Sequence, residues 1–424
     1  MTVILKVFIL HLLIMLHGVQ GHIYDVTEYG AEPSNVDNKD AFVAAWRAAC
    51  GSAAGNATLL IPEGTFAVSN IEFSGPCKNG HSPLAVVVDG VLHPCAGSCH
   101  RKSDDVWITF SSISNLLVTG AGTLDGRGGE RHSNGAKSKT TTFDNTTSIT
   151  QTLELNSVAN ATVRGLKFLN SRGFHLNLHR SSHVAAEGLR IEAPAASRNT
   201  DGIHLGLSSH VTVADSFIGT GDDCVSIGPG SSGVVVTGVV CGPGHGISVG
   251  SLGREEGEDD VRGLLVRNCT VTGTTNGLRI KTWPGSPPSR AFNITFRDIV
   301  MANVSNPIII DQHYCPHAHC SHIGKPSLVQ ISDVAYERIA GTSSSRVAVQ
   351  LLCSEDRPCS GVRFDRVNLS CGRERCGSKF SNVEGKPNLV AADEAAFGPG
   401  AVPPPEQDAD VLSPNTEQLQ VVQY

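Results

Sequence analysis

Residues 201–281 repeat one short pattern four times. The copies read Asp-Gly-Ile-His-Leu-Gly at 201–206, Asp-Cys-Val-Ser-Ile-Gly at 223–228, His-Gly-Ile-Ser-Val-Gly at 245–250 and Asn-Gly-Leu-Arg-Ile-Lys at 276–281. The steps 201 to 223 and 223 to 245 are each 22 residues long, and the step 245 to 276 is 31, its excess being placed in the polar loop 254–260. Windings of a stacked parallel coil lie about 4.8 Å apart, so equivalent residues become neighbours. The pattern predicts one column built from the first residue of each copy: Asp201, Asp223, His245 and Asn276.

A second repeat also indicates stacked coils. Ser-Ser-His-Val occurs at 181–184 and 208–211, and Ser-Ser-Gly-Val follows at 231–234, so the steps are 27 and 23 residues. Each phrase opens an apolar run that ends in a glycine turn. Similar apolar runs stand at 116–118, 163–168, 264–266, 294–296, 329–331 and 362–364. Short strands at such steps, without amphipathic helices between them, predict an all-β parallel β-helix, a solenoid, and a β-sandwich is the alternative.

One short amphipathic helix is predicted near the N-terminus. Its apolar residues follow the polar stretch 37–40 and recur at helical spacing: Ala41, Phe42, Ala45, Trp46 and Cys50. We expect this helix to cap the open end of the coil stack and to shield its apolar interior.

The two ends of the chain are predicted to lie outside the β-helix domain, which we place at residues 22–393. Residues 1–21 combine Lys6, an apolar stretch at 7–16 and small residues at 18–21, the pattern of a secretory signal peptide. The apolar stretch is shorter than the roughly 20 residues that a membrane span needs, so no membrane span is expected. Residues 394–424 hold three consecutive prolines and several acids but no lysine or arginine, which predicts a disordered tail.

The cysteine content supports secretion into the extracellular space or cell wall. The chain has 13 cysteines, and three close pairs predict small disulfide loops: Cys315/Cys320, Cys353/Cys359 and Cys371/Cys376. Because the count is odd, at least one thiol is unpaired or pairs between chains. Zinc is the competing interpretation, since histidines at 313, 317, 319 and 322 surround the first pair. Seven sequons fit a glycoprotein: Asn56, Asn145, Asn160, Asn268, Asn293, Asn303 and Asn368.

The charge of the chain limits its partners. The formal net charge is -7 at pH 7, which argues against a basic nucleic-acid surface, so no nucleic-acid partner is expected. A polyanionic substrate would have to meet a local cationic patch instead. We expect the protein to be a monomer.

Strand alternation predicts which side chains of the four copies face the solvent. It turns Ile203, Val225, Ile247 and Leu278 inward, and it turns His204, Ser226, Ser248, Arg279 and Lys281 outward. Strict alternation would also turn Asp201 and Asp223 inward. We therefore place both acids in the bend before each strand, because an unpaired buried carboxylate is costly.

The outcome is a predicted wall with three carboxylates, since Asp222 joins the two acids of the column. Carboxylates this close raise one another's pKa, so at least one should keep its proton at mildly acidic pH. Glycoside hydrolysis needs that asymmetry, because one protonated acid serves the leaving oxygen and one carboxylate serves water or attacks directly. Arg279 and Lys281, at the border of the wall, suit the carboxylate of an acidic sugar.

These residues resemble the motifs of glycoside hydrolase family 28, the polygalacturonases. Four motifs match in order: Asn199-Thr200-Asp201, Gly221-Asp222-Asp223, Gly244-His245-Gly246 and Arg279-Ile280-Lys281. Tyr314 matches a later tyrosine, and the resemblance runs from about Tyr24 to about Ser381. It implies a right-handed β-helix that needs no metal or other cofactor. It also implies hydrolysis of the α-1,4-linked galacturonan of pectin with inversion.

The resemblance also implies a role for each matched residue. Asp222 would be the general acid, Asp201 and Asp223 would activate water, and His245 would support them electrostatically. The residues that would hold galacturonate are Asn199, Arg279, Lys281 and Tyr314. The sequence from Cys241 to Gly253 is similar to that of the plant branch of the family and most like that of the exo-acting pollen enzymes.

Several alternatives stay open at this point. The enzyme could act within the galacturonan chain and not at its end, which depends on loops that the strand pattern does not show. A pectate lyase would share the solenoid but would use calcium and a basic arginine. A non-catalytic wall-binding protein would keep the scaffold alone. The spacing of about 4.8 Å between coils is nearer the carboxyl separation of retaining enzymes, so inversion rests on the resemblance.

Overall fold

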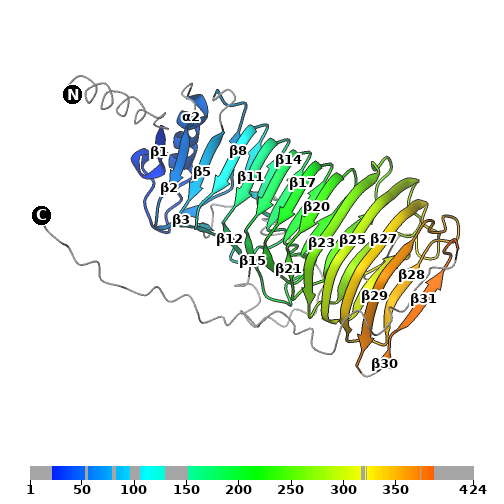
Figure 1. Ribbon diagram of the computed structural model, residues 1–424. Helices are drawn as coiled ribbons and strands as arrows, with labels where there is room; N and C mark the ends of the chain where they lie inside the picture. The colour runs from blue at the N-terminus through cyan, green and yellow to red at the C-terminus, as the bar shows by residue number, and fades with distance from the viewer. Residues whose placement is uncertain are drawn as a thin grey trace, which may run out of the picture. The chain divides into compact units, whose positions relative to one another are not determined.

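The computed structural model describes residues 22–52, 56–78, 83–95, 106–128, 151–316, 320, 322–372 and 374–385. The predicted signal peptide at 1–21 and the predicted tail at 394–424 lie outside these residues. In the described part, strands stack coil upon coil into a right-handed parallel β-helix (Figure 1), which confirms the predicted fold. No helix in this part is long and apolar enough to span a membrane.

The described strands belong to two sheets. The 11-stranded sheet contains β4 (Ile71–Ser74), β7 (Val106–Ser111), β10 (Gln151–Asn156), β13 (Leu176–His179), β16 (Ile203–Gly206), β19 (Val225–Ile227), β22 (Ile247–Leu252), β24 (Asn276–Thr282), β26 (Asn306–Asp311), β28 (Val347–Leu352) and β31 (Gly377–Ser381). The 20-stranded sheet contains β1 (Ile23–Asp25), β2 (Thr58–Ile61), β3 (Thr65–Val68), β5 (Leu84–Val88), β6 (Val91–Pro94), β8 (Ser114–Thr119), β9 (Thr123–Asp125), β11 (Ala159–Arg164), β12 (Lys167–Leu169), β14 (Ser182–Glu187), β15 (Arg190–Glu192), β17 (Ser209–Ala214), β18 (Phe217–Gly219), β20 (Ser232–Thr237), β21 (Val240–Cys241), β23 (Val261–Thr272), β25 (Ser289–Val304), β27 (Val329–Ser343), β29 (Arg363–Cys371) and β30 (Glu374–Arg375). Pairing between coils is parallel, and β29 with β30 is an antiparallel pair.

The register of the 11-stranded sheet follows the first repeat. Its central pairings align four apolar residues, each fully buried inside the coil: Ile203, Val225, Ile247 and Leu278. The column continues toward both ends of the stack, with Leu176 on one side and Ile308 on the other. Burial of this continuous column removes apolar surface from water in every coil. The paired residues are 22, 22 and 31 positions apart, which confirms the predicted coil steps.

The second repeat marks a bend that recurs in the 20-stranded sheet. Ser182 pairs with Ser209, and Ser209 pairs with Ser232, as the steps of 27 and 23 residues predict. The third residue of each four-residue repeat has a positive φ: 56° at His183, 53° at His210 and 63° at Gly233. Only glycine and a few polar residues adopt this conformation readily, which explains why histidine and glycine exchange at this position.

The predicted helix is present as α2 (Lys39–Gly51) and lies at the N-terminal end of the stack beside β1 and β2 (Figure 1). The short 3-10 helix η1 (Val26–Tyr29) contacts it. Trp46 is 3% exposed, and its ring centroid lies 5.0 Å from that of Phe73 and 5.7 Å from that of Phe110. The helix therefore covers the first coils and shields their apolar interior.

Disulfides close short loops of the chain, as predicted. The three close pairs are bonded: Cys315–Cys320, Cys353–Cys359 and Cys371–Cys376. Where both cysteines are described, the bonds Cys50–Cys77 and Cys224–Cys241 were not predicted; they join residues 27 and 17 positions apart. Cys269 is a buried free thiol, and burial raises its pKa to about 11. A thiol that keeps its proton is a poor nucleophile, so Cys269 is a packing residue.

We predict that Trp46→Ala destabilises the N-terminal coils. Removing the indole leaves a cavity beside Phe73 and Phe110, which should lower the free energy of unfolding by about 3–5 kcal/mol. Chemical denaturation measures the change. Val36→Ala, at a side chain that is 69% exposed, is the control and should change little. A Trp46→Ala protein as stable as the control would show that the helix does not seal the stack.

Candidate active site

The predicted acids lie in the bends that precede two neighbouring strands. Asp201 stands two residues before the first residue of β16, and Asp223 stands two residues before the first residue of β19. The bends continue the parallel ladder, because the Gly202 amide donates to the Asp223 carbonyl at 2.9 Å. The next coil extends this ladder through a bond of 2.8 Å from the Cys224 amide to the Gly246 carbonyl. The predicted alignment of Asp201, Asp223 and His245 is confirmed.

The bends turn both carboxyls toward the side chains that alternation directs outward, since Asp201 bonds Ser226 and Asp223 bonds Ser248. Their low exposure was not predicted. Asp201 is 7% exposed and Asp223 is 1% exposed. Each carboxyl is buried because hydrogen-bond partners from neighbouring coils replace the water that it loses. Arg279 and Lys281, which were predicted to face outward, are likewise 8% and 7% exposed and act as such partners.

Asp223 is a fully paired carboxylate. Its Oδ1 accepts hydrogen bonds from Arg279 Nη2 and from the Ser248 hydroxyl, each at 2.7 Å. Its Oδ2 accepts one from Lys281 Nζ at 2.8 Å, and Arg279 Nε donates to the Ser248 oxygen at 2.9 Å. Two cations at contact distance in a buried setting hold this group as an anion.

Asp201 has a different environment. Its Oδ2 accepts a hydrogen bond of 2.6 Å from the Ser226 hydroxyl, and no ion pair with a lysine or arginine reaches it within the described part. Burial raises the pKa of Asp201 well above its usual range, and the charges of Asp223 and Asp222 raise it further. Among the three carboxyls, Asp201 is therefore the one whose surroundings most favour a proton.

A hydrogen-bonded chain connects Asp201 to a histidine that sequence analysis did not assign to the site. Nδ1 of His204 lies 2.7 Å from the Ser226 oxygen. When the single Ser226 proton points to Asp201, His204 must donate from Nδ1. Phe174 stacks on the imidazole with ring centroids 4.4 Å apart, and burial lowers the pKa of His204 to about 4. A neutral His204 thus fixes the Ser226 hydroxyl against Asp201; alternation had predicted only that both side chains leave the core.

Asp222 is the most accessible of the three acids, with 19% of its side chain exposed. Its Oδ1 lies 2.8 Å from His245 Nδ1, and its Oδ2 accepts a hydrogen bond of 3.1 Å from the backbone N–H of Asn199. Partial burial raises the pKa of Asp222, but the hydrogen bond and charge of His245, followed by Lys281 and the Asn199 amide, lower it more, so the net shift is downward. These neighbours favour the ionised form of Asp222 beside His245.

A cavity of about 640 Å³ opens over these groups. Its described lining includes five predicted residues: Asn199, Asp222, His245, Arg279 and Tyr314. The Tyr314 ring lies 5.8 Å from the Arg279 guanidinium and 5.1 Å from Lys281 Nζ. The other three predicted residues are buried next to this lining: Asp201, Asp223 and Lys281. Asp223 bonds both Arg279 and Lys281. All eight predicted residues therefore gather at one site.

The structure bears on two possible metal sites. Ligand atoms of Asp222, Asp223 and His245 lie within 4.8 Å of one another. A metal there would have to displace a guanidinium and an ammonium group from Asp223 and break the bond between Asp222 and His245. The zinc interpretation fails at its cysteines, because Cys315 and Cys320 form a disulfide; the histidines at 317 and 319 lie outside the described residues.

Comparisons with known proteins agree with the motifs. The family model of the glycosyl hydrolases family 28 matches residues 50–391. An exopolygalacturonase from Platanus acerifolia is 43% identical over 355 residues, which cover 83% of this chain and 92% of that relative. A polygalacturonase from Medicago sativa is 39% identical over 386 residues, 91% of this chain and 90% of the relative.

A solved structure shows the same fold. The endo-xylogalacturonan hydrolase from Aspergillus tubingensis superposes with a TM-score of 0.72 and covers 88% of this chain and 98% of that one, at 23% identity. At this level of identity the likeness concerns the fold alone.

We predict that Ser226→Ala raises the pKa of Asp201 further. The Ser226 hydroxyl bonds the ionised carboxylate and so favours its charged form, and alanine removes that bond. A pH titration of the Asp201 carboxyl carbon by NMR measures the change. Ser232→Ala, on β20 in the other sheet, is the matched control and should leave the titration unchanged. An unchanged or lower pKa in Ser226→Ala would contradict the hydrogen-bonded chain.

Proposed function

We propose, because this chain belongs to the glycosyl hydrolases of family 28, that it is a polygalacturonase that hydrolyses the α-1,4-galacturonosidic bonds of pectin. The observation that carries the proposal is the arrangement of three carboxyls in different surroundings beside two cations. Asp201 is buried against the Ser226 hydroxyl, while Asp223 is bound by Arg279 and Lys281. Hydrolysis of a glycosidic bond needs one acid and one base within a single site.

Asp222 is proposed as the general acid that protonates the glycosidic oxygen. It lines the cavity and is the most exposed acid, so a substrate oxygen can reach it, whereas Asp201 and Asp223 lie beneath. The lowered pKa of Asp222 has to rise for this role. Binding of galacturonate brings further carboxylates close to Asp222, and like charges raise the pKa of a carboxyl. His245 is positioned to exchange a proton with Asp222 across their hydrogen bond.

Asp201 and Asp223 are proposed to activate the attacking water. Their carboxyls belong to neighbouring coils, so one water can contact both. In the reacting state Asp201 is ionised and Asp222 is protonated: Asp201 gives the proton that burial favours on it to solvent, and Asp222 takes one up through its hydrogen bond with His245. The attacking water then gives one proton to Asp201 beside the charge of Asp223, and its oxygen bonds the anomeric carbon as the bond to the glycosidic oxygen breaks. The glycosidic oxygen takes the proton of Asp222, so the site loses one proton and gains one. Attack on the face opposite to the departing oxygen inverts the anomeric centre.

Arg279, Lys281 and Tyr314 are proposed to hold the galacturonate beside the reacting bond, together with Asn199. The Arg279 guanidinium lines the cavity while one of its nitrogens binds Asp223, so its remaining N–H groups can face a sugar carboxylate. Tyr314 offers an aromatic face beside both cations. This arrangement favours an acidic sugar over a neutral one.

We further propose that the enzyme removes residues from the chain end, is secreted to the cell wall and acts as a monomer. Exo-acting enzymes are prominent among the similar proteins, including that of Platanus acerifolia. The disulfides of the present chain suit an oxidising compartment such as the extracellular space. Sizing the early products of polygalacturonate digestion tests the exo assignment, since an exo enzyme releases small products before the polymer shortens.

Asp222→Asn should lower the release of reducing sugar from polygalacturonate by about 10²–10⁴-fold at mildly acidic pH, because the amide carries no transferable proton. Binding of oligogalacturonate, measured by calorimetry, should persist. Asp215→Asn, the same exchange at an exposed bend, is the matched control and should keep full activity. Wild-type protein that releases no reducing sugar would refute the function, and an active Asp222→Asn protein would refute the role of this residue.

A second prediction separates hydrolysis from the lyase alternative. Digestion should continue in a chelator, since Arg279 and Lys281 already neutralise Asp223, and its products should not gain the ultraviolet absorbance of an unsaturated sugar. Absorbance and reducing sugar are followed together with and without chelator. Chelator-sensitive digestion that produces this absorbance would identify a lyase.

A further inference from the structure

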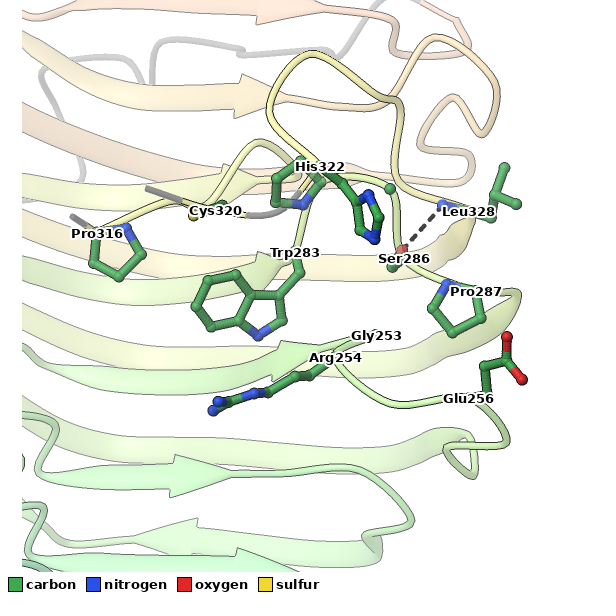
Figure 2. A pocket seen from close by; sticks show the side chains of 12 residues that line it. Gly253, Arg254, Glu256, Trp283, Ser286, Pro287, Pro316, Cys320, His322 and Leu328 are labelled. Atoms are coloured by element: carbon green, nitrogen blue, oxygen red, sulfur yellow. Dashed lines mark hydrogen bonds between the residues drawn. The ribbon is translucent and has the colours of Figure 1, made fainter. Parts of the chain in front are cut away.

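A second cavity, of about 590 Å³, lies beside the catalytic one (Figure 2). Its walls are the segments that follow the C-terminal ends of β22, β24 and β26. His245 and Asn276 lie at the N-terminal ends of β22 and β24. Pro316 lines both cavities. The Trp283 ring in the second cavity meets the Tyr314 ring of the first at 5.2 Å between centroids, so the two spaces are neighbours across one pair of aromatic rings.

The groups in this cavity suit an acidic sugar. Figure 2 shows the Arg254 side chain extended along the Trp283 indole, and the guanidinium carbon lies 5.8 Å from the ring centroid. Glu255 is 3.8 Å from Arg254, but both side chains are mostly exposed (79% and 73%), so this ion pair is weak. The cavity thus offers a guanidinium and an aromatic surface.

Both walls are held in place before any ligand arrives. The Glu258 carboxylate accepts hydrogen bonds from three successive amides of the Arg254 loop: Gly253 at 2.6 Å, Arg254 at 2.8 Å and Glu255 at 3.0 Å. On the opposite wall the Ser286 hydroxyl accepts from the Leu328 amide at 3.0 Å, the bond dashed in Figure 2. A preformed wall lowers the entropic cost of binding, so the loop is built to present Arg254.

We propose that this cavity binds the galacturonate residue that follows the one held by Arg279, Lys281 and Tyr314. The carboxylate of that residue pairs with Arg254, and its ring packs against Trp283. The inference rests on the proposed function and adds a preference for one form of the substrate. A third sugar with a free carboxylate binds more tightly than one with a methyl ester, while the reaction at Asp222 stays the same. Digalacturonate, which spans only the cleaved bond, does not reach Arg254.

The test compares substrates of two and three residues. Arg254→Gln should raise KM for trigalacturonate about tenfold, the loss of one charge-assisted contact, with kcat within about twofold. KM for digalacturonate should not change. Arg267→Gln, an exposed arginine on β23, is the matched control and should behave as the wild type with both substrates. Wild-type enzyme acting on trigalacturonate methyl-esterified at the residue placed in this cavity should show the same tenfold loss.

The outcomes separate the two proposals. A wild-type enzyme that does not hydrolyse polygalacturonate defeats the proposed function itself. A wild-type enzyme that is active, with an Arg254→Gln variant of unchanged KM for trigalacturonate, overturns the inference alone. Equal losses with both substrates also overturn it, because they show that Arg254 acts on the catalytic cavity. Calorimetric binding of trigalacturonate to Asp222→Asn, with and without Arg254→Gln, gives the affinity without turnover.

Discussion

The register between successive coils of the 11-stranded sheet is the constraint on which the site depends. The pairing of Ile203 with Val225 and of Val225 with Ile247 fixes the vertical position of everything in the bends before these strands. A slip by one residue would turn the apolar column to the solvent and the polar residues into the core. The core therefore enforces the alignment that brings Asp201 and Asp223 together.

Within that alignment, the distribution of cations creates the chemical asymmetry. Arg279 and Lys281 come from one strand and both reach Asp223, two coils away, so this carboxylate is neutralised inside the protein. Within the described part, Asp201 bonds the Ser226 hydroxyl and no cation, and burial raises its pKa. Asp222 faces the cavity with His245. Three identical side chains thus differ in charge and access, which is what acid–base hydrolysis requires.

Neighbouring coils also extend the site beyond the reacting bond. The bends before β16 and β19 hold Asp201 and Asp223, and the loops after β22 and β24 hold Arg254 and Trp283. Tyr314 lies between the two cavities and contacts Lys281 on one side and Trp283 on the other. A polymeric substrate is longer than any single cavity, so a solenoid face with sites at both ends of its strands suits a polyanionic chain.

The sequence by itself determined the coil steps, the capping helix around Trp46 and the set of residues that meet at the site, because both repeats report burial once per coil. The tertiary structure alone decided how deeply the acids lie, that His204 and Ser226 hold Asp201, and which carboxyl keeps the proton. These properties depend on side chains two or more coils apart, whose burial and hydrogen bonds no local pattern encodes. Spacing shows that the carboxyls are near one another but not that Asp222 is the one that meets His245, whose hydrogen bond and charge lower the pKa of that carboxyl.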